Sequence, residues 1–355
     1  MYCAFVYSGH KKYLIVKRIF FLLLILVVPF RMWAQSVPTG TEFRTRNTPV
    51  HDPVMIKEKG TYYLFCTGNG ISVFSSHDMQ HWHKEAAVFN KPPEWAVKAV
   101  PGFKGHIWAP DISFYKGRYY LYYAVSAFGK NTSCIGLAVN KTLDPASPDY
   151  KWEDMGKVIQ SVPGRDMWNA IDPNLVFDES GTPWLSFGSF WEGIKLVKMT
   201  QDLQTVSEPQ EWYTIARRPR DFTTPDTSAG NGAIEAPFIF RKGKYYYLFV
   251  SRDYCCRAEK STYKVVVGRS EKVQGPYLDR QGVPLQSDGG TLVIQGDSVN
   301  WYGAGHNAVF TDSNKDYLVL HGYDAHDRGR SKLLLEEITW DSDGWPEPIR
   351  LGAGQ

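Results

Sequence analysis

The fold is decided by one short segment that recurs along the chain, first as HDPVMIKEKGTYYLFC at residues 51–66. The segment joins a polar residue and a proline to an apolar stretch, a glycine turn and an aromatic-rich strand. Related segments follow at intervals of about 60 residues, a spacing that is typical of radial or solenoid repetition. The copies begin at Trp108-Ala109-Pro110-Asp111, Ile171-Asp172-Pro173, Glu235-Ala236-Pro237 and, more weakly, Gly305-His306-Asn307.

Each copy continues into a strand pattern rich in aromatic and β-branched residues and preceded by a turn. Helical periodicity is nearly absent. Repeated antiparallel sheets of this size, five in number, favour an all-β fold, a five-bladed β-propeller, over a β-sandwich, which would not require such self-similarity. The start of each copy should then lie at one end of the central axis. The strand segments are 61–66, 118–123, 182–187, 244–250 and 316–321.

The composition is that of a globular protein with a large core. The chain has 355 residues, of which 43% are hydrophobic and 15% aromatic. Its net charge of +3 is too small to argue for a nucleic acid or a membrane surface as partner. Because no linker or low-complexity tract follows Gln35, we expect residues 35–355 to form a single domain.

The N-terminus resembles a targeting segment. Lys17 and Arg18 precede an apolar run at 19–30, and Ala34 offers a small residue before Gln35. This order predicts a signal peptide at residues 1–34, with a retained signal anchor as the alternative. The apolar run is too short for a comfortable transmembrane span. We therefore expect a secreted or periplasmic protein.

Four cysteines remain after that segment, and two of them are adjacent: Cys66, Cys134, Cys255 and Cys256. Their spacing fits no metal-binding pattern. Neighbouring cysteines rarely bridge each other, so buried thiols are at least as good an interpretation. The sequence leaves the oxidation state of Cys255 and Cys256 open.

Three carboxylates lie near matching positions of the copies: Asp52, Asp172 and Glu235. One such residue alone would be assigned to a turn. Three of them at one end of a propeller axis would share a concave, partly dry site, where they cannot all stay ionised. Such a site supplies an acid beside a base, the pair that glycosidic bond cleavage needs. Asp111 is out of phase with the others, and we interpret it as a structural residue or as one that supports the residues of the site.

Further motifs accompany these carboxylates in a fixed order. They read HIWAPD at 106–111, VSAFGKNTS at 125–133, NAIDPN at 169–174, GSFW at 188–191 and DYCCR at 253–257. In this combination the chain resembles the arabinan endo-1,5-α-L-arabinosidases (arabinanases) of glycoside hydrolase family 43, over nearly all of residues 45–350.

The resemblance implies a propeller catalytic domain that cleaves internal 1,5-α-L-arabinofuranosidic bonds of arabinan with inversion. In that scheme Asp52 is the general base that activates water, and Glu235 is the general acid. Asp172 orients Glu235 and keeps it protonated.

The resemblance also implies the residues that bind substrate and metal. A metal, commonly calcium with water as most of its ligands, would be held by His306 at the propeller axis. A single nitrogen ligand is unusual for this oxygen-seeking ion. The substrate-binding residues would be His51, Trp108, Phe128, Gly136, Asn169, Ala170, Ile171, Asn174, Ser189, Phe190 and Trp191.

Two other functions stay open. An exo-acting α-L-arabinofuranosidase or β-xylosidase of the same family would carry the same three carboxylates. A non-catalytic polysaccharide-binding propeller would not need them. The expected partners are arabinan or arabino-oligosaccharides, with no nucleic acid and no membrane after removal of the signal peptide, and the expected state is a monomer. Product length and preference for linear or branched arabinan do not follow from the sequence.

Overall fold

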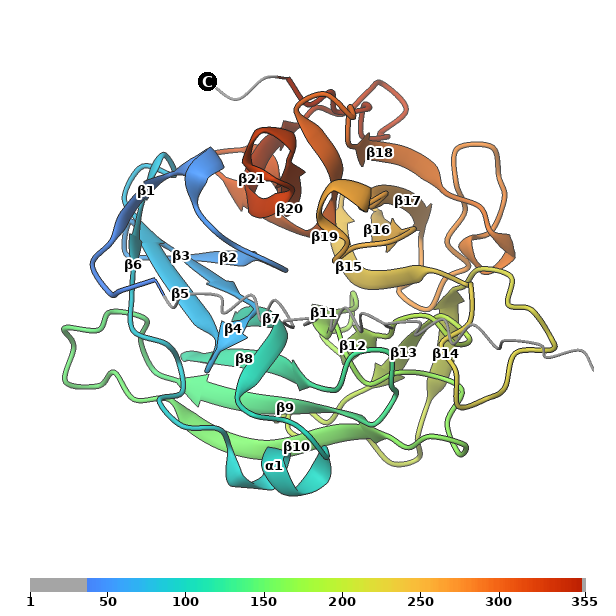
Figure 1. The fold of residues 1–355 in the computed structure, drawn as a ribbon. Coiled ribbons are helices and arrows are strands. Elements are labelled where there is room, and N and C mark those ends of the chain that lie inside the picture. The colour runs from blue at the N-terminus through green and yellow to red at the C-terminus, as the bar shows by residue number, and fades with distance from the viewer. Residues whose placement is uncertain (1–36, 353–355) are drawn as a thin grey trace, which may run out of the picture. The chain divides into compact units, whose positions relative to one another are not determined.

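The computed structural model describes residues 37–352, so the expected signal peptide at 1–34 lies outside the described residues. Five antiparallel sheets are arranged around one axis (Figure 1), which confirms the predicted five-bladed β-propeller. Within the described residues, no helix is long and apolar enough to cross a membrane. The longest helix, α1 (Glu94–Ala99), has six residues.

The first two blades each have five strands. In blade 1 the order from the outside to the axis is β1 (Glu42–Arg44), β6 (His81–Lys84), β5 (Ser72–Ser76), β3 (Thr61–Cys66) and β2 (Val54–Glu58). In blade 2 the order is β10 (Glu153–Ser161), β9 (Ser133–Asn140), β8 (Arg118–Val125), β7 (His106–Tyr115) and the two-residue β4 (Gly68–Asn69).

The other three blades start from their inner strand. Blade 3 runs β11 (Asn174–Phe177), β12 (Pro183–Phe187), β13 (Ile194–Lys198) and β14 (Trp212–Ala216). Blade 4 runs β15 (Ile234–Lys242), β16 (Tyr245–Arg252), β17 (Lys264–Ser270) and β18 (Thr291–Gln295). Blade 5 has β19 (Trp301–Asp312), β20 (Lys315–Asp324) and β21 (Arg330–Ile338).

The ring of blades is closed between blades 5 and 1. The inner strands contact one another in the order β2, β7, β11, β15, β19 and back to β2. The segment before β2 also binds the last strand: the Leu333 amide donates to the Thr48 carbonyl at 3.0 Å, and Arg46 pairs with Glu336 at 2.9 Å. Closure protects the sheet edges that face the axis.

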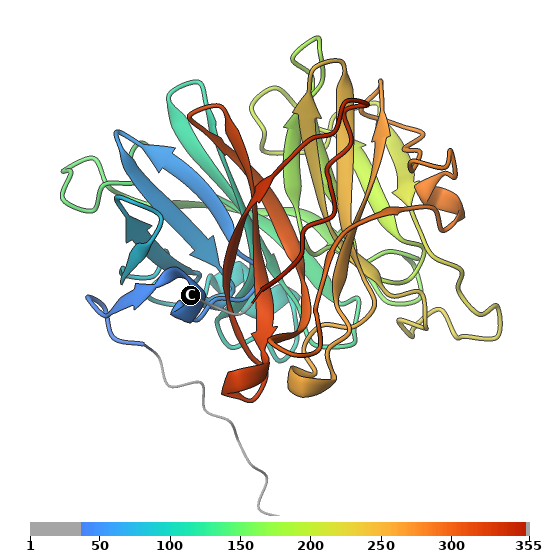
Figure 2. The same ribbon diagram turned by 90° about the horizontal axis from the view of Figure 1, so that it is seen from above.

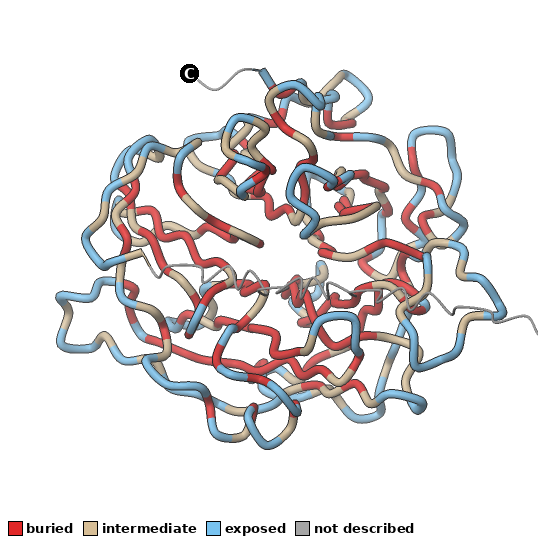
Figure 3. The backbone as a smooth tube through the Cα atoms, in the orientation of Figure 1, coloured by how far each residue is buried: buried red, intermediate tan, exposed pale blue. Residues whose placement is uncertain are grey.

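The apolar core lies between neighbouring blades. Large side chains such as Trp82 and Trp184 are almost completely buried, and burying such a ring contributes roughly 2–3 kcal/mol. Buried residues follow the strands, whereas the connecting loops are mostly exposed (Figure 3). The rigid strands therefore fix the positions of the segments that lie at their ends.

A left-handed residue interrupts the start of the repeat in every blade. Three of the inner strands also shift register at this point. Residues other than glycine adopt positive φ at a cost of about 1 kcal/mol or more. Such backbone conformations cluster at functional sites. The five residues and their φ angles are Asp52 (53°), Ala109 (40°), Asp172 (57°), Ala236 (53°) and His306 (51°).

We call the left-handed residue and the irregular backbone around it the bulge of each blade. The bulge changes the alignment of the carboxylates that the sequence predicted. The sequence placed Asp52, Asp172 and Glu235 at nearly the same repeat position. In the structure Asp52 and Asp172 share the left-handed position, but Glu235 precedes the left-handed Ala236 by one residue. Glu235 therefore projects from a different point of the bulge than the two aspartates.

Candidate active site at the propeller axis

Side chains from one blade bind the bulge of the next. The Asp52 amide donates to His321 Nδ1 at 3.1 Å, and the Ala109 amide donates to Thr67 Oγ1 at 2.8 Å. The Ala236 amide donates to Asp172 Oδ2 at 3.0 Å, and the His306 amide to Ser251 Oγ at 2.8 Å. These bonds tie four of the five bulges to the preceding blade, which preorganises the axial residues.

Asp52 lies at the centre of the site and is held by three side chains. Its Oδ1 is 2.8 Å from His51 Nδ1 and 3.0 Å from His306 Nδ1. Its Oδ2 accepts a hydrogen bond from the Thr67 hydroxyl at 2.5 Å. Burial raises the pKa of Asp52, but the charges and hydrogen bonds of His306 and His51 outweigh it, so the pKa lies well below its usual range. Asp52 is therefore ionised and oriented.

His306 interacts electrostatically with all three carboxyl groups. Burial lowers the pKa of His306, but Asp52, Asp172 and Glu235 raise it, and the result is about 9. At neutral pH its ring is thus an imidazolium that pairs with Asp52 when no other cation is present.

The second carboxyl group, Asp172, is the one that retains a proton. Its pKa is raised to about 8, mainly by burial and further by the negative charges of Glu235 and Asp52, against the opposing effect of His306. The charge of Glu235 contributes to this shift, so ionisation of either carboxyl group opposes ionisation of the other. A carboxyl group that keeps its proton near neutral pH can supply a proton for general acid catalysis.

Glu235 is fixed by two hydroxyl groups. Ser189 Oγ donates to Oε2 and Tyr263 OH donates to Oε1, each at 2.8 Å. Burial and the nearby carboxylates Glu235 and Asp172 raise the pKa of Tyr263 well above its usual range, so its hydroxyl stays a donor. The carboxyl group of Glu235 is thereby held in one orientation.

The predicted substrate residues fall into two groups. Four of them are partly or fully exposed: His51, Trp108, Phe190 and Phe128, the last with 78% of its surface exposed. The others are buried: Gly136, Asn169, Ala170, Ile171, Asn174, Ser189 and Trp191. Only Ser189 of the buried group bonds directly to one of the three carboxylates through its side chain.

Asn174 makes structural hydrogen bonds, and its expected substrate contact stays a prediction. Its Nδ2 donates to Asp111 Oδ1 at 3.2 Å, and its Oδ1 accepts from the Ile239 amide at 2.8 Å. The side chain thereby joins blades 2, 3 and 4. The structural interpretation of Asp111 is confirmed, since its other oxygen accepts from the Leu175 amide at 2.8 Å.

Packing also accounts for Gly136 without a substrate. A Cβ atom at this position would come within 2.6 Å of both Trp95 Cζ2 and Tyr123 Cζ. A larger residue would collide with these rings, so glycine is required by the interior of blade 2. A substrate contact at Gly136 stays a prediction.

The cysteines divide into two kinds. Cys255 and Cys256 form a disulfide bond, an oxidation state that the sequence had left open. Cys66 and Cys134 are free and buried, as expected for small apolar residues. Cys256 Sγ lies 3.8 Å from His51 Nε2, which places the disulfide at the rim of the site. The helices η2 (Ala258–Lys260) and η4 (Ala325–Asp327), which follow the disulfide and β20, lie at the same end of the blades (Figure 2).

Sequence reasoning missed several residues that support the axial site. Thr67 and Tyr263 bind carboxylates, Ser251 binds the His306 amide, and Tyr323 contacts His51. Thr67, Ser251 and Tyr323 lie at or just beyond the ends of second strands, opposite the bulges. A search for polar residues that end the second strand of every copy would have found these three. Tyr263 precedes a third strand, and no pattern in the sequence marks it.

The axial residues offer a limited set of metal donors. His306 could contribute one imidazole nitrogen. The next residue, Asn307, is 3% exposed, and both polar atoms of its amide are without a hydrogen-bond partner among the described residues. Since buried amides are normally satisfied by protein or water, this donor set fits a cation that keeps much of its water shell. A second set, His51, Asp52 and His321, lies within 4.8 Å, but its atoms already bond to one another.

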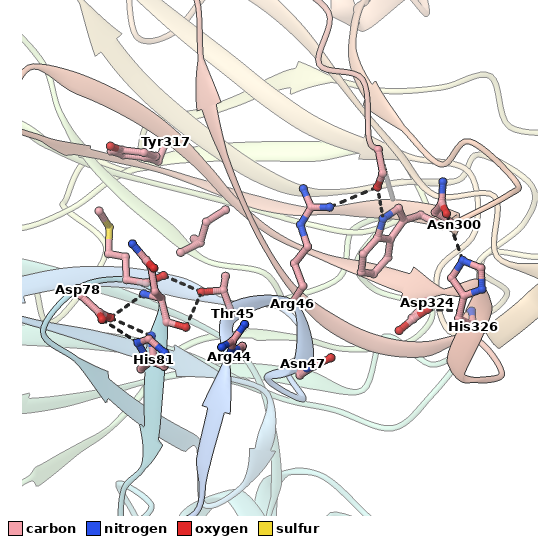
Figure 4. Close-up of a pocket in the computed structure, with 15 residues that line it drawn as sticks. Arg44, Thr45, Arg46, Asn47, Asp78, His81, Asn300, Tyr317, Asp324 and His326 are labelled. Atoms are coloured by element: carbon pink, nitrogen blue, oxygen red, sulfur yellow. Dashed lines mark hydrogen bonds and ion pairs between the residues drawn. The ribbon is translucent and has the colours of Figure 1, made fainter. Parts of the chain in front are cut away.

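One large cavity lies away from the carboxylates. It measures about 1050 Å³ and lies between segments of blade 1 and blade 5 (Figure 4). Its lining includes Arg44, Asp78, His81, Asn300 and Tyr317, and none of the axial residues. The three carboxylates and His306 therefore do not line this cavity.

A propeller whose axial carboxyl groups interact, with the pKa of one lowered and that of another raised, defines a class of carboxylate-dependent glycoside hydrolases. Residues 46–346 match the model of glycosyl hydrolases family 43, and the chain belongs to this family.

Relatives and a solved structure support the same group. The "Extracellular exo-alpha-(1->5)-L-arabinofuranosidase ArbA" of Cellvibrio japonicus (strain Ueda107) is 54% identical over 85% of this chain and 87% of the relative. The "Extracellular endo-alpha-(1->5)-L-arabinanase 1" of Bacillus subtilis (strain 168) is 42% identical over 84% and 88%. The structure of Cellvibrio cellulosa α-L-arabinanase complexed with arabinohexaose has a TM-score of 0.83 at 54% identity, covering 84% of this chain and 95% of that one.

Proposed function

We propose that this protein hydrolyses 1,5-α-L-arabinofuranosidic bonds of arabinan with inversion of configuration. The observation that carries the proposal is the contrast between two carboxyl groups at the axis: the pKa of Asp52 lies well below its usual range beside two histidines, and the pKa of buried Asp172 is raised to about 8. The names of the relatives support arabinan and its oligosaccharides as the substrate.

In the proposed mechanism Asp52 accepts a proton from the attacking water. The contacts of Oδ1 with two histidines and of Oδ2 with Thr67 keep the carboxylate in place for this task. Glu235 delivers a proton to the leaving oxygen while Ser189 and Tyr263 hold its carboxyl group. Asp172 binds the amide that follows Glu235 and shares its proton. An inverting pair needs room for one water between base and acid.

The position of cleavage along the arabinan polysaccharide is a separate proposal. The 54% identical relative is named as exo-acting, which favours release of products from a chain end. The family resemblance and the 42% identical relative favour internal cleavage, the mode expected from the sequence. Viscosity and products, followed together on linear 1,5-α-arabinan, distinguish the two. A rapid fall in viscosity with mixed oligosaccharides means endo action, whereas one short product with slow viscosity loss means exo action.

We also propose that one cation, calcium by its expected ligand chemistry, binds at the axis. His306 and Asn307 would hold it, with water as its other ligands. When bound, the ion would supply positive charge close to the carboxylates. Secretion is a further proposal, supported by the word "extracellular" in the names of both relatives.

The direct test of the hydrolase proposal compares the wild-type protein with an Asp52→Asn variant on linear arabinan. We expect release of reducing sugar by the wild type and a loss of about 10³-fold or more in the variant. A wild type that binds arabinan without releasing sugar would support the non-catalytic alternative.

A further inference from the structure

Tyr323 occupies a position that none of the assigned roles explains. It lies near the end of β20, two residues after His321, and is 3% exposed. Its hydroxyl lies 2.7 Å from the Cys256 amide nitrogen, 3.0 Å from His51 Nε2 and 3.2 Å from His321 Nε2. One phenol thus links the disulfide loop to two histidines that contact Asp52.

The direction of these hydrogen bonds follows from His321. The Asp52 amide donates to His321 Nδ1, so this nitrogen carries no proton. Burial lowers the pKa of His321 well below its usual range, which keeps the ring neutral. A neutral imidazole with a bare Nδ1 carries its proton on Nε2, and that N–H donates to the Tyr323 oxygen.

The phenol oxygen then receives two donors, the Cys256 amide and His321 Nε2. Its own proton is left for His51 Nε2 at 3.0 Å. His51 must therefore carry its proton on Nδ1, the atom 2.8 Å from Asp52 Oδ1. The His51 ring also stacks on His321, with ring centroids 4.0 Å apart, which restricts its rotation.

We infer that Tyr323 is a positioning residue for Asp52, because it fixes the tautomer and the orientation of His51. The inference rests on the proposed role of Asp52 as general base. Without the hydroxyl, His51 Nε2 loses its hydrogen-bond donor, and only the Asp52 carboxylate still favours the proton on Nδ1. Whenever the proton is on Nε2 instead, the lone pair of Nδ1 faces the Asp52 carboxylate and the contact is repulsive.

A Tyr323→Phe variant removes the hydroxyl and little else. We expect kcat on linear arabinan to fall by about 10-fold or more while KM changes by less than about 2-fold, by analogy with groups that orient metal-binding histidines through a hydrogen bond. Tyr277→Phe is the matched control, because Tyr277 is also fully buried and its hydroxyl donates to the Val273 carbonyl at 2.7 Å. The control should lower the melting temperature without lowering kcat.

A double-mutant cycle separates positioning from general damage. If Tyr323 acts through His51, adding Tyr323→Phe to a His51→Ala variant costs no further activity. Full additivity of the two losses, or a Tyr323→Phe variant with wild-type kcat, would overturn the inference.

The tautomer can also be read in the unaltered protein. Nitrogen NMR of the histidine-labelled chain, with His51 assigned by comparison with His51→Ala, should show a protonated Nδ1 and an unprotonated Nε2 at neutral pH. The opposite tautomer would refute the role of Tyr323 even if the variant failed to fold. A wild type without activity on arabinan would instead refute the proposed function.

Discussion

His306 Nδ1 lies 3.0 Å from Asp52 Oδ1, so the left-handed residues of the last and first blades meet in an ion pair. The pair stands where the ring of blades closes. The imidazolium lowers the pKa of Asp52 against the effect of burial and keeps the carboxylate ionised. The contact between blades 5 and 1 that closes the propeller therefore also keeps Asp52, the proposed base, ionised.

Replacing His306 with glutamine should move the acid limb of the kcat/KM profile to higher pH. The positive charge that favours ionised Asp52 is lost, so the pKa of Asp52 rises toward its usual value or above it. The quantity to measure is the pH at which the acid limb lies. The absolute value of kcat/KM is less useful, because it also falls if the variant loses a bound metal. His326→Gln is the control, since His326 is exposed and bonds to Asn300 away from the axis. An unmoved acid limb would contradict the role of the ion pair.

The alkaline limb should report the proton shared by Asp172 and Glu235. We expect kcat/KM to fall as the pH rises through about 8, where Asp172 ionises. In an Asp172→Asn variant one of the opposing negative charges is gone, so the remaining proton is lost more easily and the limb moves to lower pH. A limb that stays in place in this variant would mean that the proton resides elsewhere.

Glu235→Gln should affect substrates according to their leaving groups. On arabinan we expect a loss of about 10²–10⁴-fold, the usual contribution of a general acid. Aryl arabinofuranosides with acidic leaving groups need little protonation and should lose much less. Glu179→Gln, in an exposed turn of blade 3, serves as the control. Equal losses on both substrates would argue against the acid role of Glu235.

Removal of bound metal should reduce the thermal stability. The untreated protein should contain the metal in a defined stoichiometry. We expect about one calcium per chain by elemental analysis, and a lower melting temperature after chelation because an ion that binds only the folded state stabilises it. His306→Gln should bind none and should not respond to chelator. An unchanged melting temperature after verified removal would refute the proposed metal site.

Asp111 provides a stability prediction that is independent of catalysis. Burial raises its folded-state pKa to about 6, above the value in the unfolded chain. The protonated form is thus favoured by folding, and its stabilising contribution is present at low pH and lost as the pH rises through about 6. The difference in unfolding free energy between wild type and Asp111→Asn should fall by about 3 kcal/mol from pH 3.5 to 7.

Chemical unfolding across this pH range checks the Asp111 prediction. Asp149→Asn makes the same charge change at an exposed position and should show no such trend. A constant difference between wild type and Asp111→Asn would mean that Asp111 is ionised at no cost in the folded protein.

The repeat made the propeller predictable from the sequence. A proline or asparagine after the left-handed residue, followed by a tight turn and a strand rich in aromatic and apolar residues, marks the inner hairpin of each blade. The same pattern brought Asp52, Asp172 and His306 to one end of the axis. It placed Glu235 only approximately, because the register shift of the bulge cannot be read from side-chain periodicity.

The groups that support the carboxylates were less predictable. Thr67 and Tyr323 act across a blade boundary or from the far end of a hairpin, and neither belongs to a motif. The Cys255–Cys256 disulfide could not be decided from the sequence, since adjacency argues against a bridge but does not exclude one. Contacts of this kind depend on the final packing of the blades.

The measurement that tests the central claim most directly is the configuration of the first product. Proton NMR of linear 1,5-α-L-arabinan during the first minutes of hydrolysis shows which anomer forms before mutarotation. If Asp52 activates water opposite Glu235, the β-anomer appears first and an Asp52→Asn variant releases almost none. The α-anomer appearing first, or equal release by that variant, would contradict the proposed mechanism.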